Sequence, residues 1–222
     1  MAIEIATFDC YGTLIDWEGG AASFLYSLAC RFDDDPPPGR ELRERWEEIQ
    51  FGHLQGEYRP YREILGSSLR EWAAERGYDA PDDAAEAFAL SMESWQPFPD
   101  TVPALRAAKE AGVRLWIISN TDRAIMEHSL RHLEVEFDGF TVAEDARAYK
   151  PADAPFDLAL SELGADPQDI LHVAFGFKYD IAAAQRHGMA TAWVNRKREP
   201  APGAERPDHE WDDLWPLAEV VG

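Results

Sequence analysis

The feature of this sequence that most restricts its fold is an apolar run near the N-terminus, closed by a carboxylate and a glycine. The run ends at Phe8 and predicts a short buried strand, with Asp9 directly after it. Gly12 then permits a sharp turn, because glycine adopts a positive φ without steric cost. The pattern predicts that Asp9 and Thr13 face a common pocket. A lone aspartate after a strand is more often a turn former or a helix cap, so catalysis by Asp9 needs partners elsewhere.

Such partners follow later predicted strands. The apolar run 113–118 ends at Ser119, and the run 170–174 leads to Asp180 through an aromatic segment. Lys150 lies between these two runs in the sequence, and helical patterns separate the strands. Alternation of strands and helices predicts a parallel sheet, in which the carboxyl ends of the strands converge on one crevice. The sequence therefore predicts one site built from Asp9, Ser119, Lys150 and Asp180.

The segment between the first two strands is expected to be wholly helical. Residues 17–96 carry apolar side chains at spacings of three and four, and the charged, proline-rich stretch 33–39 must interrupt the first helix. A turn and a helix cap are predicted at 98–101, and further strands at 140–143, 191–195 and 210–214. These elements predict an α/β fold with a Rossmann-like parallel sheet of five or six strands. Its core comprises residues 1–16 and 97–222, and residues 17–96 form an inserted helical subdomain.

Composition excludes several classes of protein. The 222 residues are 45 % hydrophobic and 12 % aromatic, which argues against disorder. A net charge of −21 repels nucleic acid and anionic membranes, so neither is expected as a partner. An anionic substrate therefore needs a local positive field, for which Lys150 and nearby backbone N–H groups are the candidates.

The expected setting is the cytoplasm. No stretch approaches the roughly 18 apolar residues of a membrane span, and the N-terminus begins a strand rather than a basic and apolar leader. Cys10 and Cys30 are too few for a disulfide framework or a zinc site. The eight tryptophans suggest a possible homodimer if some of them are exposed.

The four elements around the candidate site residues, in this order, resemble those of the haloacid dehalogenase superfamily. Asp9 matches the aspartate of its DxxGT element, and Ser119, Lys150 and Asp180 match the second, third and fourth elements. The resemblance covers nearly the whole chain. It implies that the helical insertion is a cap, which closes over the catalytic crevice and supplies substrate contacts.

Two departures from the superfamily pattern bear on the reaction. Its magnesium-dependent phosphatases carry a second aspartate two residues after the nucleophile and another acid in the fourth element. Here these places hold Tyr11 and Phe175. Because Mg²⁺ prefers several hard oxygen ligands, we expect no metal and no cofactor. A tyrosine is also a weaker acid than a carboxyl group near neutral pH.

An Asp-x-Tyr-Gly-Thr element resembles the L-2-haloacid dehalogenase branch, whose members work without metal. The resemblance implies that Asp9 displaces halide from a short 2-substituted carboxylic acid and forms an ester, which water activated by Asp180 then hydrolyses. Lys150 is expected to keep Asp9 ionised. Thr13 and Ser119 are expected to fix carboxylates by hydrogen bonds. The expected substrate-binding or halide-binding residues are Tyr11, Asn120, Phe175 and Tyr179.

Two mismatches leave the substrate open. Trp46 is followed by Glu47, where the dehalogenases have an arginine that helps to abstract halide. The fourth element contains Phe175 and Phe177, where the dehalogenases have serine and asparagine that hold the water. Opening of a strained ring such as azetidine-2-carboxylate is therefore a related hypothesis. A magnesium phosphatase and a non-catalytic binding protein are the other two hypotheses.

Overall fold

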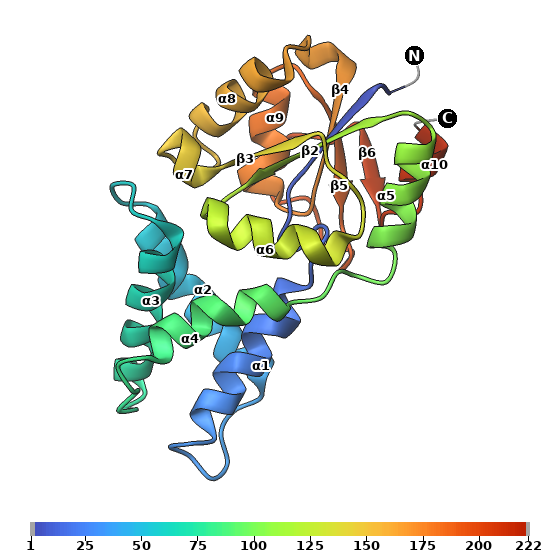
Figure 1. Ribbon diagram of the computed structural model, residues 1–222. Coiled ribbons are helices and arrows are strands. Elements are labelled where there is room, and N and C mark those ends of the chain that lie inside the picture. The colour runs from blue at the N-terminus through green and yellow to red at the C-terminus, as the bar shows by residue number, and fades with distance from the viewer. Residues whose placement is uncertain (1–2, 221–222) are drawn as a thin grey trace.

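A six-stranded parallel sheet forms the centre of the computed structural model, which describes residues 3–220 (Figure 1). The strand order is β3-β2-β1-β4-β5-β6. The central strands β1 and β4 are buried along their whole length and are apolar except for Thr7 and His172, because helices bury both of their faces. The α/β fold with a parallel sheet is thereby confirmed. The strands are β1 (Ile5–Phe8), β2 (Arg114–Ser119), β3 (Gly139–Val142), β4 (Ile170–Ala174), β5 (Ala190–Val194) and β6 (His209–Trp211).

Helices cover the sheet on both faces (Figure 1). One face carries α5 (Thr101–Glu110), α6 (Arg123–Leu133) and α10 (Leu217–Val220). The other carries α8 (Ala154–Leu163) and α9 (Ala182–Arg186). The shorter elements are α7 (Ala143–Ala146), η1 (Met92–Ser94), η2 (Pro167–Asp169) and the π-helical turn η3 (Phe177–Ile181).

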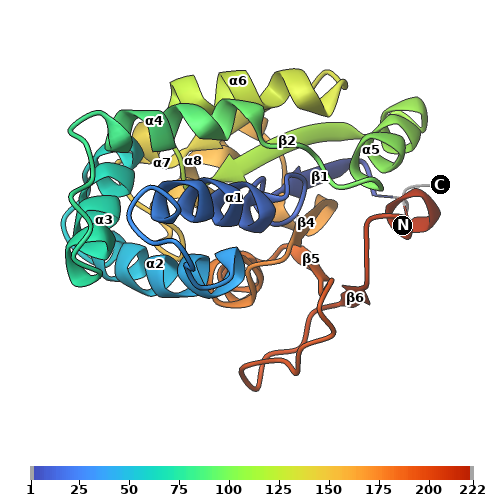
Figure 2. The same cartoon turned by 90° about the horizontal axis from the view of Figure 1, so that it is seen from below.

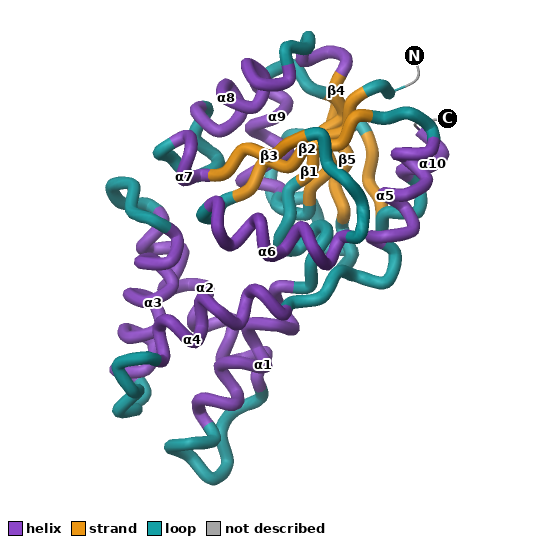
Figure 3. The backbone as a smooth tube through the Cα atoms, in the orientation of Figure 1, coloured by secondary structure: helices purple, strands orange, loops and turns teal. Residues whose placement is uncertain are grey.

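Four helices between β1 and α5 form a separate layer, here called the helical bundle. They are α1 (Trp17–Ala29), α2 (Gly39–Leu54), α3 (Tyr61–Glu75) and α4 (Ala84–Ser91). Trp46, Trp72 and Phe88 are fully buried where these helices meet. The bundle lies beyond the end of the sheet at which β1 stops (Figure 3). The chain leaves α1 after Ala29, before the stretch 33–39 that was predicted to interrupt the first helix, and α2 begins at Gly39.

Three local predictions need correction. Trp95 lies beyond the last bundle helix with an extended backbone rather than in it. Asp100 does not cap α5 with its side chain. Its carboxylate instead accepts two hydrogen bonds from Arg196, at 3.0 and 2.9 Å, because an arginine fork satisfies both oxygens. The last strand begins and ends earlier than predicted, at His209–Trp211, since only these residues pair with β5.

A carboxylate beside the sheet completes the start of α3. The backbone N–H groups of Tyr61 and Arg62 donate to the two oxygens of Asp122, at 2.7 and 2.8 Å. Asp122 precedes α6, and α3 has no capping side chain of its own. The first N–H groups of a helix have no partner within the helix, so Asp122 satisfies two that the bundle leaves open.

Two surface features bear on the expected partners. Among residues 3–220, no helix combines the length and the apolar character that crossing a bilayer requires. Trp215 is the only exposed tryptophan of the eight, whereas the expected homodimer depended on several; the homodimer stays a prediction.

The connection 195–208 between β5 and β6 projects from the rest of the molecule (Figure 2).

Gly12 is expected to tolerate no side chain. Its φ is +100°, and a Cβ atom there would lie 2.4 Å from the ring of Phe175. We expect Gly12→Ala to lower the free energy of unfolding by about 3 kcal/mol, from a left-handed backbone penalty and an overpacked contact. Gly112→Ala is the matched control, because Gly112 also has a positive φ but its Cβ would meet nothing within 4 Å. Urea titration of both variants measures the difference, and equal losses would contradict the proposed clash.

Candidate functional site

A buried lysine joins the two carboxylates that the sequence predicts. Lys150 Nζ donates to Asp9 Oδ1 at 3.0 Å and to Asp180 Oδ1 at 2.5 Å. Its third hydrogen bond, at 2.7 Å, goes to the carbonyl of Ile118 at the end of β2. An ammonium has three N–H donors, so all three are used. The structure therefore brings Asp9, Lys150 and Asp180 together as predicted.

The topology of the sheet explains this convergence. Phe8 at the end of β1 pairs with Ile117 of β2 and with Val173 of β4, so the three strands end side by side. Asp9 follows β1 directly, whereas Asp180 reaches the site through the η3 turn after β4. Lys150 does not pair with Glu144 or Asp145, which bind Arg123 instead.

Asn120 positions Lys150 through the main chain. Its Oδ1 accepts from the backbone N–H of Lys150 at 2.7 Å, and its Nδ2 donates to the carbonyl of the same residue at 3.1 Å. Asn120 also lines the cavity above Asp9. One of its two amide hydrogens is thus committed to the lysine backbone, which leaves the other for the expected contact with a leaving group.

Burial and the attraction between opposite charges act in opposite directions on the pKa values of the three groups. Burial acts to lower the pKa of Lys150, but the attraction of Asp180 and Asp9 outweighs it, and the pKa is raised. Burial acts to raise the pKa of Asp180, but Lys150 and His172 outweigh it, and the pKa is lowered. For Asp9 burial prevails over Lys150, with a further contribution from Asp180, and the pKa is raised. Asp180 is the more stable anion of the two, and Asp9 is the more basic carboxylate.

Two hydroxyl groups lie beside the nucleophile candidate. Thr13 Oγ1 donates to Asp9 Oδ2 at 2.9 Å and accepts from the backbone N–H of Phe175 at 2.9 Å. Both contacts together fix the direction of the Thr13 hydrogen toward Asp9. Ser119 Oγ is buried and has no hydrogen-bond partner within the described part of the chain, although the residue lines the cavity. An unpartnered buried hydroxyl at a cavity is available to a substrate.

His172 is a member of the site that the sequence did not predict. Its Nε2 lies 3.3 Å from Asp180 Oδ1 and its Nδ1 lies 2.8 Å from Thr7 Oγ1. Thr7 and His172 are paired across β1 and β4, which places both side chains on the same face. A carboxylate only accepts, so Nε2 donates to Asp180, and Nδ1 shares a hydrogen bond with the Thr7 hydroxyl. A histidine inside an apolar strand that leads to a candidate carboxylate is the sequence signal for this contact.

The carboxylates open into a cavity of about 110 Å³ between the sheet and the bundle. From the candidate residues, Tyr11, Phe175 and Tyr179 contribute to its wall, and Tyr11 OH contacts Ser129 Oγ at 2.7 Å. Burial raises the pKa of Tyr179 to about 12, so this phenol is neutral at neutral pH. Bundle residues complete the wall: Trp17, Glu47, Gln50, Phe51, Leu54 and Tyr61.

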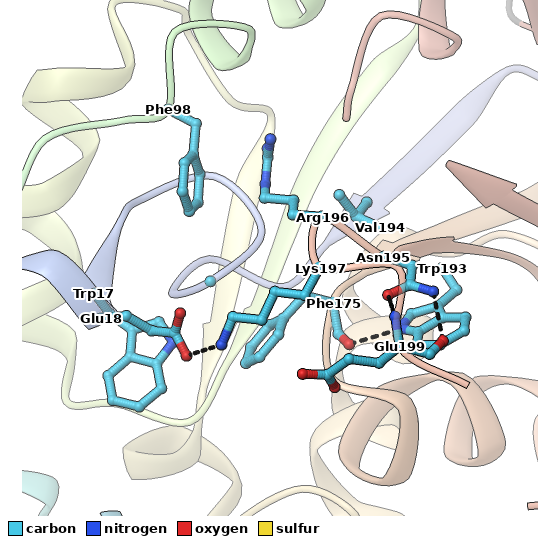
Figure 4. Close-up of a pocket in the computed structure, with 11 residues that line it drawn as sticks. Trp17, Glu18, Phe98, Phe175, Trp193, Val194, Asn195, Arg196, Lys197 and Glu199 are labelled. Atoms are coloured by element: carbon cyan, nitrogen blue, oxygen red, sulfur yellow. Dashed lines mark hydrogen bonds and ion pairs between the residues drawn. The ribbon is translucent and has the colours of Figure 1, made fainter. Parts of the chain in front are cut away.

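A second cavity of about 260 Å³ lies beside the first (Figure 4). Trp17 and Phe175 line both cavities and form the partition between them. On the far side, Lys197 of the connection after β5 reaches Glu18 of α1 at 2.6 Å. This ion pair joins the sheet to the bundle. It is half exposed, so it contributes little stability in water.

The residues present do not fit a magnesium ion. Asp9 and Asp180 are the carboxylates at the sheet edge, and Lys150 Nζ lies between them in contact with both. Phe175, where the phosphatases have an acid, presents a ring and no oxygen ligand from its side chain. In the part of the chain from Ile3 to Val220, no three His, Cys, Asp or Glu side chains are grouped as metal ligands. A hard cation with several oxygen ligands has no suitable donor set here.

The chain is similar in sequence and in structure to several dehalogenases. It is 28 % identical over 204 residues to haloacetate dehalogenase H-2 of Moraxella sp. (strain B), with 87 % of this chain and 86 % of that protein covered. It is also 28 % identical to an (S)-2-haloacid dehalogenase of Pseudomonas putida, with 88 % and 86 % covered. The crystal structure of the L-2-haloacid dehalogenase RSc1362 superimposes with a TM-score of 0.88 at 26 % identity, with 100 % of this chain and 99 % of that chain covered.

A relative of different chemistry has similar identity. The pyrophosphatase PpaX of Bacillus pumilus (strain SAFR-032) is 29 % identical, with 99 % of this chain and 97 % of that protein covered. The family model for haloacid dehalogenase-like hydrolases matches residues 3–188, which include every candidate site residue. The chain is therefore a hydrolase that belongs to the haloacid dehalogenase-like family.

Proposed function

We propose that this hydrolase works without metal and uses Asp9 as a nucleophile toward carbon. The observation that carries the proposal is the buried bridge of Lys150 between Asp9 and Asp180. Its ammonium offsets the negative charge of both carboxylates, so they attract a metal cation less strongly. The substrate class proposed is a short carboxylic acid that bears a leaving group such as halide at carbon 2. The names of the dehalogenase relatives and the first-element tyrosine, Tyr11, support this class.

The reaction proceeds in two steps. An oxygen of Asp9 forms a bond to carbon 2 of the substrate as the bond to the leaving group breaks, and halide departs with the electron pair. The product of this step is an aspartyl ester. Water then loses a proton to Asp180 and attacks the ester carbonyl, which releases the 2-hydroxy acid and regenerates Asp9.

Each neighbouring group supports one of these steps. Lys150 stabilises the negative charge on Asp9 before attack, and Thr13 orients the carboxylate. Ser119 Oγ is free to donate to the substrate carboxylate. His172 holds Asp180 from the sheet side, which compensates for the serine and asparagine that the fourth element lacks. The helical bundle acts as the cap over this cavity.

Metal removal is the test of this proposal. Because no oxygen-rich ligand set is present, turnover of 2-chloropropionate is expected to persist unchanged in EDTA. p-Nitrophenyl phosphate, which a magnesium phosphatase hydrolyses, is expected to remain intact with or without added Mg²⁺. Ion chromatography for chloride and absorbance for nitrophenol measure the two reactions.

A magnesium phosphatase is the second candidate, favoured by the similarity to the pyrophosphatase PpaX. Phosphate release that EDTA abolishes would replace the first proposal with this one. A panel of haloacids, strained cyclic amino acids and phosphate esters from which nothing is turned over would instead favour a binding protein.

A further inference from the structure

The cavity has an excess of acidic side chains. Asp9, Glu47 and Asp180 line it, whereas Lys150 is the only cation among the described residues of its wall. Lys150 is already bound to two of these acids and has no free N–H. A substrate carboxylate therefore meets no unused positive side chain, and its approach is opposed by Glu47 and by the net charge of −21.

The arginines near Glu47 do not replace the missing positive charge. Arg43, one turn earlier on α2, pairs with Glu47 but is only 4 % exposed and lies over the ring of Trp17. It is absent from the residues that line the cavity. The other arginines near Glu47 pair elsewhere: Arg40 with Glu44, Arg45 with Glu48 and Glu75, and Arg59 with His53. The surface that faces the substrate at this point is thus a carboxylate with an arginine behind it.

An outer cavity extends the acidic surface toward solvent. It measures about 620 Å³ and shares Glu47, Phe51 and Tyr179 with the catalytic cavity, so the two cavities adjoin at these residues. Glu44 and Glu48 add two further carboxylates on the same helix, each paired with an arginine, and Lys178 is the cation among the described residues of this wall. The rings of Phe51 and Tyr179 are in edge contact at 5.8 Å between centroids. Carboxylates together with aromatic rings favour a cation over an anion.

We propose that Glu47 determines the charge of the substrate, and that the substrate carries an ammonium group close to the carbon that Asp9 attacks. Such a compound is a cation or a zwitterion, in contrast to a simple 2-haloalkanoate. The inference rests on the proposed function, since it takes this cavity as the place where Asp9 meets its substrate. For a β-chloroamine the chemistry balances: the Asp9 oxygen bonds to the chloromethyl carbon, chloride leaves with the electron pair, and water hydrolyses the ester to an alcohol. The ammonium group is unchanged throughout.

Binding of unreactive ligands tests the charge preference without any turnover. Propylammonium and propionate have the same chain length and opposite charge, and calorimetry measures their affinities for the intact chain. Propylammonium is expected to bind at least tenfold more tightly than propionate, and Glu47→Gln is expected to abolish this preference. Glu41→Gln is the matched control, because Glu41 lies on the exposed side of α2 and lines neither cavity. Propionate binding as tightly as propylammonium to the unmodified protein would overturn the inference.

Turnover then separates this inference from the proposed function. We expect kcat/KM for 3-chloro-L-alanine to exceed that for 2-chloropropionate, and Glu47→Gln to reverse the order. A higher value for 2-chloropropionate in the unmodified protein would refute the role of Glu47 and leave nucleophilic Asp9 in place. Turnover without label in Asp9 would refute the proposed function, whereas the ligand affinities would still report on Glu47.

Discussion

Asp9→Asn is expected to reduce turnover of the best substrate by at least about 10³-fold, as removal of a nucleophile does in other hydrolases. The physical reason is that an amide has no negative charge and is a much weaker nucleophile than a carboxylate. The variant should still fold, because Asn has the size of Asp, its one carbonyl oxygen can accept from Lys150, and its amide N–H can donate to Thr13 Oγ1. Initial rates and the far-UV circular dichroism of the variant measure the two expectations. Asp82→Asn, at an exposed position of the bundle, is the control for removal of a charge.

Isotope labelling tests the ester intermediate on Asp9 directly. In a single turnover in ¹⁸O-water with excess enzyme, hydrolysis of the ester at its carbonyl places one solvent oxygen in Asp9. Mass spectrometry of the peptide that contains Asp9 detects the label. Direct attack of water on the substrate would place the label in the product instead. Labelled product together with unlabelled Asp9 would remove the covalent intermediate from the mechanism.

Lys150→Met is expected to have the second largest effect. It leaves Asp9 and Asp180 buried, close together and without a cation, which costs about 3–5 kcal/mol in the free energy of unfolding at neutral pH. Activity should fall with it, because the two carboxylates then share a proton and Asp9 is less ionised. Lys109→Met is the matched control: its single pair with Asp138 has a similar N···O distance, 2.7 Å, but lies a third exposed. We expect the control to lose less than about 1 kcal/mol.

The pH dependence of this loss gives its cause. Without Lys150, both carboxyl groups have folded-state pKa values above the ordinary 3.8, so the folded variant binds protons more readily than the unfolded chain. Its stability deficit should shrink as the pH falls from neutral toward 4. In the unmodified protein Asp180 contributes in the opposite sense, since its lowered pKa gives stability that is present above 3.8 and lost at lower pH. A deficit that is independent of pH would indicate lost packing rather than uncompensated charge, and adding Asp180→Asn should then restore nothing.

The sequence predicted the sheet and three of the site's charged groups for one physical reason. Polar side chains at the ends of apolar runs have few places to lie in a parallel sheet except its carboxyl edge, so Asp9, Lys150 and Asp180 converge. The helical segment was predictable from a different pattern, because its apolar residues recur with a period of 3.6 and a proline stretch interrupts it.

Contacts between distant elements were beyond this kind of prediction. His172 joins the site only because the register of β1 and β4 pairs it with Thr7. The carboxylate of Asp100 has a partner 96 positions away, Arg196, which no local pattern indicates. Arg43 and Glu47 lie one turn apart on the same side of α2, so which of them lines the cavity depends on the position of the cavity along the helix, which the spacing alone does not give.

The contact of Asp122 with α3 has a consequence for how the molecule opens. The first two N–H groups of that helix have carboxylate partners only while the bundle lies against the sheet. A swing of the bundle away from the active site therefore breaks these two hydrogen bonds and exposes the carboxyl group of Asp122 to water. Burial raises the pKa of this group in the closed arrangement. Separation and fraying of the first turn of α3 become one event. Such a separation leaves the first turn of α3 without two of its partners, and return of the bundle to the sheet restores them.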